Sequence, residues 1–171
     1  MKRIVIATVQ NGGILNRITT MLNKRQLHVV SFSLSPSNED GTSNMTMVIE
    51  ESDQHKMEQL IKQFQKQIDV MQVADITDDA MVARELALIK VRAGGHVRSE
   101  IQGIITPFRA SVIDISKDTL TVQVTGTPDK VEALATLLEP YGIINLNRTG
   151  ITACLRGQQS HITNIHAPVF V

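Results

Sequence analysis

The sequence predicts an α+β protein made of two successive modules, each with the order β-α-β-β-α-β. Apolar residues alternate with polar ones in some stretches, as in half-buried strands, and recur every three or four positions in others, as in amphipathic helices. The order of these stretches in residues 1–77 repeats in residues 81–157, on either side of a polar break at residues 77–80. These two observations together predict both the fold class and the domain boundary.

In the first module, the alternating stretches predict strands at residues 4–9, 30–35, 45–50 and 68–76. A first helix follows the first strand, and a second helix begins after Ser52 and Asp53, either of which can cap it. The apolar faces of the two helices are formed by Ile14, Leu15, Ile18, Met21 and Leu22, and by Met57, Leu60, Ile61 and Phe64.

The second module repeats this arrangement, with strands predicted at residues 86–92, 112–115, 120–125 and 143–153. A glycine pair, Gly94 and Gly95, again precedes the first helix. Thr127 and Pro128 suit the N-cap and first position of the second helix, and Gly142 suits its end. The helical faces are formed by Val97, Ile101, Ile104, Ile105 and Phe108, and by Val131, Leu134, Leu137, Leu138 and Tyr141.

We therefore expect two ferredoxin-like modules, each a four-stranded antiparallel sheet with two helices on one face. A module of this size buries only about 60–65% of the surface of its unfolded chain, so docking or dimerisation is expected. Residues 158–171 show no period and are predicted to be irregular.

Composition excludes several classes of function. Lys plus Arg and Asp plus Glu number 17 each, which gives no basic excess for binding nucleic acid. The strands also lack the aromatic residues that stack RNA bases. The apolar runs are too short to span a bilayer, and the N-terminal residues have no pattern of a signal peptide. With Cys154 as the only cysteine, a reducing compartment, the cytoplasm, is expected.

The sequence contains no recognisable catalytic constellation. The five histidines lack the spacing of zinc ligands, and no nucleophile elbow or Walker loop is present. Asp114 and Asp118 flank a predicted strand end, where solvated carboxylates are usual. Cys154 is predicted to be a small buried apolar residue. A small-molecule sensor or an interaction subunit, with no catalytic residues or metal site of its own, remains.

One stretch has the composition of a ligand site. A β-branched strand ends near Gln10, a turn containing Gly12 and Gly13 follows, and a helix begins near Ile14. The first N–H groups of such a helix lack intrahelical partners, and they can hold a carboxylate or a phosphate. The same junction is also typical of a tight turn that binds nothing.

Several motifs, taken in order, resemble the small, regulatory subunit of acetolactate synthase (acetohydroxyacid synthase), whose first module is an ACT domain. The resemblance covers about residues 2–157. Its motifs are NGGILNRI at residues 11–18, SNMT at 43–46, QIDV at 67–70, RELALIKV at 84–91, FRASVIDI at 108–115 and TVQVTGT at 121–127.

The resemblance implies a function in the biosynthesis of valine, leucine and isoleucine. Small subunits of this family activate a catalytic subunit that converts two pyruvates to 2-acetolactate and CO2, and they transmit feedback inhibition, usually by valine. The cofactors of that reaction, thiamine diphosphate, Mg²⁺ and FAD, belong to the large catalytic subunit, and none is expected in this chain.

The family also implies a homodimer with the effector at the interface of two ACT modules. The strand–helix loop of one chain would face the second strand of the other, which predicts an effector site made of Asn11, Gly12, Gly13, Ile14, His28, Val29 and Val30. The family loop commonly has one more residue, and His28 stands where the family carries asparagine. Both differences lie at the effector position and predict weak feedback by valine.

Two other interpretations remain open from the sequence. One is a stand-alone ACT protein that senses an amino acid and regulates transcription or another enzyme; it would need a basic surface or a DNA-binding helix pair, and neither is evident. The other is a purely structural dimerisation module.

Overall fold

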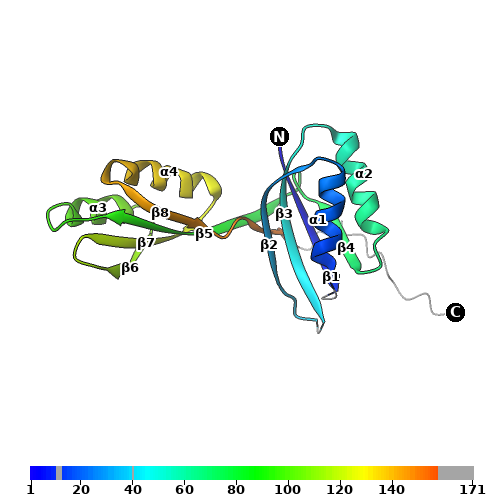
Figure 1. The fold of residues 1–171 in the computed structure, drawn as a ribbon, viewed down its shortest axis with the longest axis horizontal. Coiled ribbons are helices and arrows are strands. Elements are labelled where there is room, and N and C mark those ends of the chain that lie inside the picture. Colours follow the sequence, from blue (N-terminus) through cyan, green and yellow to red (C-terminus); the bar gives the residue numbers. More distant parts are fainter. Residues whose placement is uncertain (11–12, 40, 158–171) are drawn as a thin grey trace. The chain divides into compact units, whose positions relative to one another are not determined.

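The computed structural model describes residues 1–10, 13–39 and 41–157 (Figure 1). The chain forms two compact units. The first contains residues 1–82 together with residues 151–157, and the second runs from Ala83 to Gly150. The second unit is therefore an insertion between two parts of the first.

The first unit is a four-stranded antiparallel sheet in the order β2-β3-β1-β4. Helices α1 and α2 cover one face of this sheet, and β2 lies at its edge (Figure 1). The elements are β1 (Lys2–Gln10), α1 (Ile14–Lys24), β2 (His28–Pro36), β3 (Thr42–Glu50), α2 (Gln54–Gln65) and β4 (Val70–Asp75).

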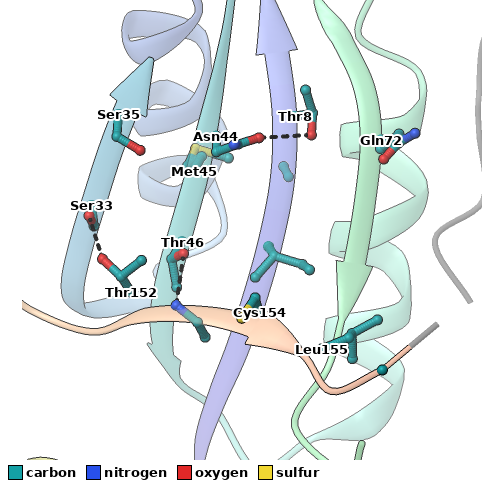
Figure 2. Close-up of a pocket in the computed structure, with 14 residues that line it drawn as sticks. Thr8, Ser33, Ser35, Asn44, Met45, Thr46, Gln72, Thr152, Cys154 and Leu155 are labelled. Carbon is teal, nitrogen blue, oxygen red and sulfur yellow. Dashed lines mark hydrogen bonds between the residues drawn. The ribbon is translucent and has the colours of Figure 1, made fainter. Parts of the chain in front are cut away.

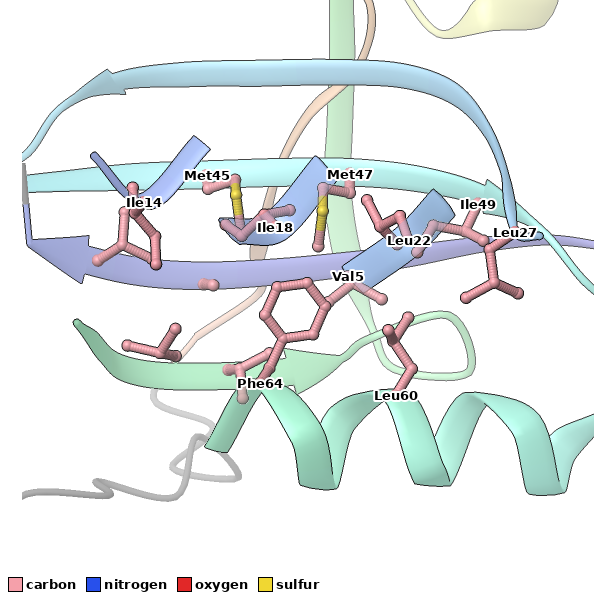
Figure 3. Close-up of a cluster of buried hydrophobic side chains, with 14 of the residues drawn as sticks. Val5, Ile14, Ile18, Leu22, Leu27, Met45, Met47, Ile49, Leu60 and Phe64 are labelled. Carbon is pink, nitrogen blue, oxygen red and sulfur yellow. The ribbon is translucent and has the colours of Figure 1, made fainter. Parts of the chain in front are cut away.

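The core of this unit lies between the sheet and the two helices (Figure 3). Phe64 of α2 and Ile18 of α1 are fully buried there, and they meet Met45 and Met47 of β3. The helical spacing of the apolar residues explains why one face of each helix packs against the sheet. Asp53 caps α2 by accepting hydrogen bonds from the N–H groups of His55 and Lys56, at 2.9 and 3.4 Å.

The second unit repeats this topology with the sheet order β6-β7-β5-β8. Thr127 caps α4 by accepting from the N–H of Lys130, Pro128 is the first residue of that helix, and Gly142 ends the following 3₁₀ turn with a φ of +85°. The elements are β5 (Met81–Arg92), α3 (Arg98–Ile105), β6 (Ser111–Ile115), β7 (Thr119–Gly126), α4 (Pro128–Leu138), a 3₁₀ turn (Glu139–Tyr141) and β8 (Ile143–Arg148).

The predicted α+β class and the two βαββαβ modules are confirmed. The last strand differs, because the stretch predicted at residues 143–153 is two strands. Strand β8 ends at Arg148, Gly150 turns the chain with a φ of +77°, and β9 (Thr152–Leu155) belongs to the first unit. The structure therefore divides the chain after Val82 and Gly150, whereas the sequence suggested one break at residues 77–80. The predicted irregular tail, residues 158–171, lies outside the described residues.

Candidate functional site

The junction between β1 and α1 has a glycine at the N-cap of the helix. Gly13 occupies this position with φ +73° and ψ 12°, and it has no side chain to bond to the first N–H groups of α1. Helices α2 and α4, by contrast, are capped by Asp53 and Thr127. The positive end of the α1 dipole is therefore available to an anion. Asn11 and Gly12, the other predicted loop residues, lie outside the described residues.

Residues around the junction fix its position on the sheet. The side chain of Ile14 is buried in the core, so this predicted site residue can face a ligand only through its backbone. One helical turn later, Arg17 forms an ion pair with Asp69, and the N–H of Gln10 donates to the carbonyl of Asp69 at 2.8 Å. The end of β1, the first turn of α1 and the start of β4 are thus tied together.

The other predicted site residues begin strand β2. His28 is exposed and lies opposite Glu50 of β3. Val29 is half-buried against the core, whereas Val30 sits at a shift of the strand register and is 42% exposed. Of these three side chains, His28 and Val30 are therefore accessible at the edge of the sheet.

Within one chain, these two groups of residues lie at opposite ends of the sheet. Strand β3 pairs Glu50 with both Lys2 and His28, so His28 is level with the first residue of β1. The loop before Gly13 follows Gln10, at the other end of β1. Eight steps along a strand span roughly 26 Å, so one copy of the chain does not bring the loop and His28 together.

Comparisons with known proteins match both halves of the chain. Residues 6–72 match the family described as the AHAS small subunit-like ACT domain, and residues 84–157 match the family described as the small subunit of acetolactate synthase. The acetolactate synthase small subunit of Bacillus subtilis is 51% identical over 93% of each chain. That of Aquifex aeolicus is 40% identical over 91% of this chain and 81% of its own.

This chain belongs to the acetolactate synthase small-subunit family. The crystal structure of the small subunit from Thermotoga maritima agrees with the fold, with a TM-score of 0.84, 29% identity and coverage of 93% of this chain and 99% of that one. The chain is thus a regulatory small subunit of acetolactate synthase with an ACT domain, and that enzyme belongs to branched-chain amino acid biosynthesis. None of the helices in the described residues is long and apolar enough to cross a membrane.

The sequence reasoning missed a groove on the ACT sheet of this small subunit, on the face away from the helices. Strand β9 crosses that face, and beside it lies a cavity of about 450 Å³ (Figure 2). Cys154 lines this cavity and is exposed, so the prediction of a buried apolar cysteine was wrong. The serines that alternate along β2 were the available signal for a polar face, but no periodicity indicated that a later segment would cross it.

The described residues contain no cluster of three or more His, Cys, Asp or Glu side chains placed to hold a metal ion. Just before α2, the N–H groups of Asp53 and Ser52 donate to Glu51 and lower the pKa of its carboxyl. The candidate effector site is thus a backbone-lined helix end together with a strand edge.

Proposed function

We propose that this small subunit activates the large catalytic subunit of acetolactate synthase and carries an effector site for valine between two copies of its ACT domain. The observation that supports this most directly is the separation of the Gly13 junction and His28 along one sheet. A site that uses both needs a second chain, and the open edge of β2 offers the place for it.

A two-fold axis through the β2 edge would unite the two groups. Pairing two β2 strands antiparallel about Phe32 puts His28 of the partner subunit level with Pro36. Pro36 lies opposite Ser43, which in turn lies opposite Val9 at the end of β1. The same symmetry places the β1–α1 loop of each chain against strand β2 of the other chain, so a dimer would hold two equivalent sites.

The chemistry of the two sides suits a branched amino acid. The uncapped N-terminus of α1 would take the carboxylate, since its N–H groups and dipole favour an anion. Asn11 would supply an amide to the polar groups of the effector. The exposed side chain of Val30 would offer an apolar surface to a branched side chain.

The catalytic chemistry belongs to the partner. We infer that the large subunit holds thiamine diphosphate, Mg²⁺ and FAD, and that this chain contributes no catalytic residue. Its own part would be to stabilise the active form of the large subunit and to lower that stabilisation when valine binds. The coupling between two such sites is typically about 1–3 kcal/mol.

The test is reconstitution with the purified catalytic subunit. We expect the enzyme to copurify with this chain and to gain activity, with weak inhibition by valine at about pH 6 and pH 8. His28→Asn restores a compact neutral donor and acceptor, and we expect it to lower the valine concentration for half-inhibition by about fivefold or more. His55→Asn, at an exposed histidine of α2, is the matched control and leaves inhibition unchanged.

Each part of the proposal can fail separately. If no catalytic subunit binds, the activating role is wrong and a stand-alone amino-acid sensor takes its place. If activation occurs but His28→Asn and the unmodified chain respond equally to valine, His28 does not contact the effector. Strong inhibition of the unmodified complex would contradict the expected weakening.

A further inference from the structure

The two helices of the first unit carry most of its positive charge. Helices α1 and α2 lie on the same face of the sheet (Figure 1), and residues 14–27 and 54–67, which contain them, include six Lys or Arg and one acidic residue, Glu58. The rest of residues 1–82 includes two Lys or Arg and nine Asp or Glu. The two signs of charge are therefore separated within this unit. We call the six residues of the helices the basic surface: Arg17, Lys24, Arg25, Lys56, Lys62 and Lys66.

Most of the basic surface has no acidic partner. Arg17 pairs with Asp69, and Lys56 pairs with Glu51 at 3.4 Å. The other four cations, Lys24, Arg25, Lys62 and Lys66, form no ion pair with any described residue. All of the six side chains are exposed except that of Arg25, which is half-buried.

Two shallow grooves between the helices connect the basic residues of α1 with those of α2. One groove, of about 350 Å³, is lined by Arg17 and Lys24 of α1 and by two glutamines near the end of α2. The other, of about 220 Å³, is lined by Arg25, which follows α1, and by Lys56 of α2. None of the described residues that line either groove is acidic. The basic surface is thus continuous across both helices.

Local helix stability explains only part of this pattern. Lys24 and Lys62 lie in the last turns of α1 and α2, where a positive charge interacts favourably with the helix dipole. Solvated helices usually combine such lysines with acidic residues one turn away, because the pairs stabilise the helix. Glu58 is the one acidic residue available for this, and its carboxylate pairs with no described cation. The surplus of positive charge is therefore a property of the surface.

The extent and surroundings of the basic surface favour a protein partner. Lys56 and Lys66 are ten residues apart, which is about 15 Å along a helix axis, so one phosphate or carboxylate reaches only part of the surface. Nucleic acid is disfavoured because the chain has no net positive charge.

A second copy of this chain is also a poor partner for the basic surface. Asp75 and Asp78, two acidic residues of the first unit, already pair with Arg3. A contact between unlike surfaces of two copies would also be head to tail, and such contacts form open chains unless the rotation closes a ring.

We propose that the basic surface docks on an acidic surface of the large catalytic subunit. This assignment rests on the proposed function, in which the large subunit is the partner, and it names the face of the first unit that the partner contacts. Complementary charges of this kind accelerate encounter and fix the orientation of docking. The sheet edge at β2 and the β1–α1 junction stay available for the proposed dimer and its effector.

Charge reversal of two exposed lysines tests the docking surface. In Lys62→Glu with Lys66→Glu, we expect the concentration of small subunit that gives half-maximal activation of the purified large subunit to rise about tenfold or more at low salt. Activation at saturation should stay unchanged, because the surface supplies binding and not the activating change itself. Lys62→Gln with Lys66→Gln should give a smaller rise, since it removes the charges without reversing them.

The matched control is Lys2→Glu with Lys117→Glu, which changes the net charge equally at two exposed lysines outside the basic surface. We expect it to shift the half-maximal concentration less than about twofold. Raising NaCl from about 0.05 to about 0.5 M should weaken binding of the unmodified chain and reduce its advantage over the reversed variant, because salt screens exposed charges. Circular dichroism checks that each variant is folded.

Cross-linking identifies the groups on the other side of the contact. A carbodiimide joins lysine amines to carboxylates that touch them, and mass spectrometry locates the joined residues. In the complex, we expect Lys24, Lys62 and Lys66 to be joined to Asp or Glu of the large subunit, and Lys2 and Lys117 to be joined to none.

The possible failures are distinguishable. If the unmodified chain does not bind the large subunit, the proposed function and the docking surface are both wrong. If it binds and activates, but reversal at Lys62 and Lys66 changes the half-maximal concentration no more than the control does, the docking surface is wrong and the proposed function stands. Cross-links from these lysines only to other copies of this chain would assign the basic surface to self-association instead.

Discussion

Arg148 of β8 holds the buried carboxylate of Glu85 of β5 through two hydrogen bonds. Its Nε donates to one carboxylate oxygen at 3.3 Å, and a terminal nitrogen donates to the other. The remaining terminal nitrogen donates to Glu132 of α4 at 2.9 Å. The hydrogen bond to Glu85 is the main reason that the pKa of Arg148 is raised. One guanidinium therefore joins an edge strand, a central strand and a helix of the second unit.

Replacing this guanidinium should destabilise the second unit. Arg148→Ala leaves Glu85, which is only 6% exposed, as a buried charge without a cation. Because the Arg148 side chain is one-third exposed, water can partly replace it. We expect the free energy of unfolding to fall by about 2–3 kcal/mol, below the 3–5 typical of a fully buried pair. Chemical denaturation followed by circular dichroism measures it.

Two variants define the cause of that loss. Glu132→Ala removes an exposed partner and should cost less than about 1 kcal/mol. The double variant Glu85→Gln, Arg148→Met removes both charges and should be more stable than Arg148→Ala alone. If Arg148→Ala changes the stability no more than Glu132→Ala does, the pair does not support this part of the fold.

The sequence allowed most of the fold to be predicted, because each module contains strong local periodicity. Ile18 and Phe64 belong to helical stripes, and their burial follows from spacing alone. Strand β9 could not be predicted in its place, since its contacts to Ser33 and Thr46 lie more than a hundred residues away in the sequence. The bond between Arg148 and Glu85 was missed because it also joins residues far apart in the sequence, here by 63 positions.

The candidate site was predictable to a smaller degree. The glycine-containing turn indicated an open helix start, and the structure gives Gly13 the conformation that glycine tolerates best. The distance between this turn and His28 depends on strand register, which the sequence pattern does not report. The groove beside β9 depends on long-range contacts in the same way.

Acid should weaken the start of α2 through Glu51. Its carboxylate accepts from the N–H groups of Ser52 and Asp53 at 2.9 and 3.0 Å, and these bonds lower its pKa below 4.5. A carboxyl with a lowered folded-state pKa stabilises the fold above its unfolded value, and this contribution is lost as the pH falls through the folded value. Glu51→Gln should therefore reduce stability near pH 7 and have a smaller effect near pH 3.

Urea denaturation of both proteins at several pH values measures this effect. Glu58→Gln, at an exposed carboxylate further along α2, is the matched control and should not alter the pH profile. An identical loss for Glu51→Gln at neutral and acidic pH would mean that the substitution acts by some route other than the charge.

The proposed two-fold edge gives a prediction about assembly. Val30 and Leu34 of β2 are 42% and 38% exposed in one chain, although both are apolar. If the β2 strands of two copies pair, these side chains become buried, and each contributes about 1–2 kcal/mol. Val30→Lys with Leu34→Lys should therefore weaken the dimer about 100-fold or more while leaving the monomer folded.

Light scattering and sedimentation across a range of micromolar concentrations measure the change. The same pair of substitutions at Ile113 and Ile115 of β6, which are 50% and 63% exposed, tests whether the corresponding edge of the second unit matters. A monomer in the unmodified protein, or a dimer that both β2 lysines leave intact, would place the interface elsewhere.

The first module should fold and act without the second. All residues of its apolar core, from Val5 to Val73, lie within residues 1–80, and none comes from β9. Ile151 and strand β9 contribute hydrogen bonds of 3.3 to 3.5 Å to side chains on the polar face, and such bonds have modest net energies of about 0.5–1.5 kcal/mol each. A chain that ends at Ala80 should thus be less stable than the full chain but still unfold cooperatively.

Reconstitution shows whether this fragment also activates the catalytic subunit. We expect partial activation, since the proposed β2 edge and effector site lie wholly within residues 1–80, and residues 81–157 would mainly tune the response. Adding Val30→Lys and Leu34→Lys to the fragment separates folding from assembly, because both side chains are exposed in one chain. If the fragment unfolds cooperatively but gives no activation, the contact with the catalytic subunit requires residues 81–157. If the fragment is unfolded, β9 contributes more stability than its few long hydrogen bonds suggest.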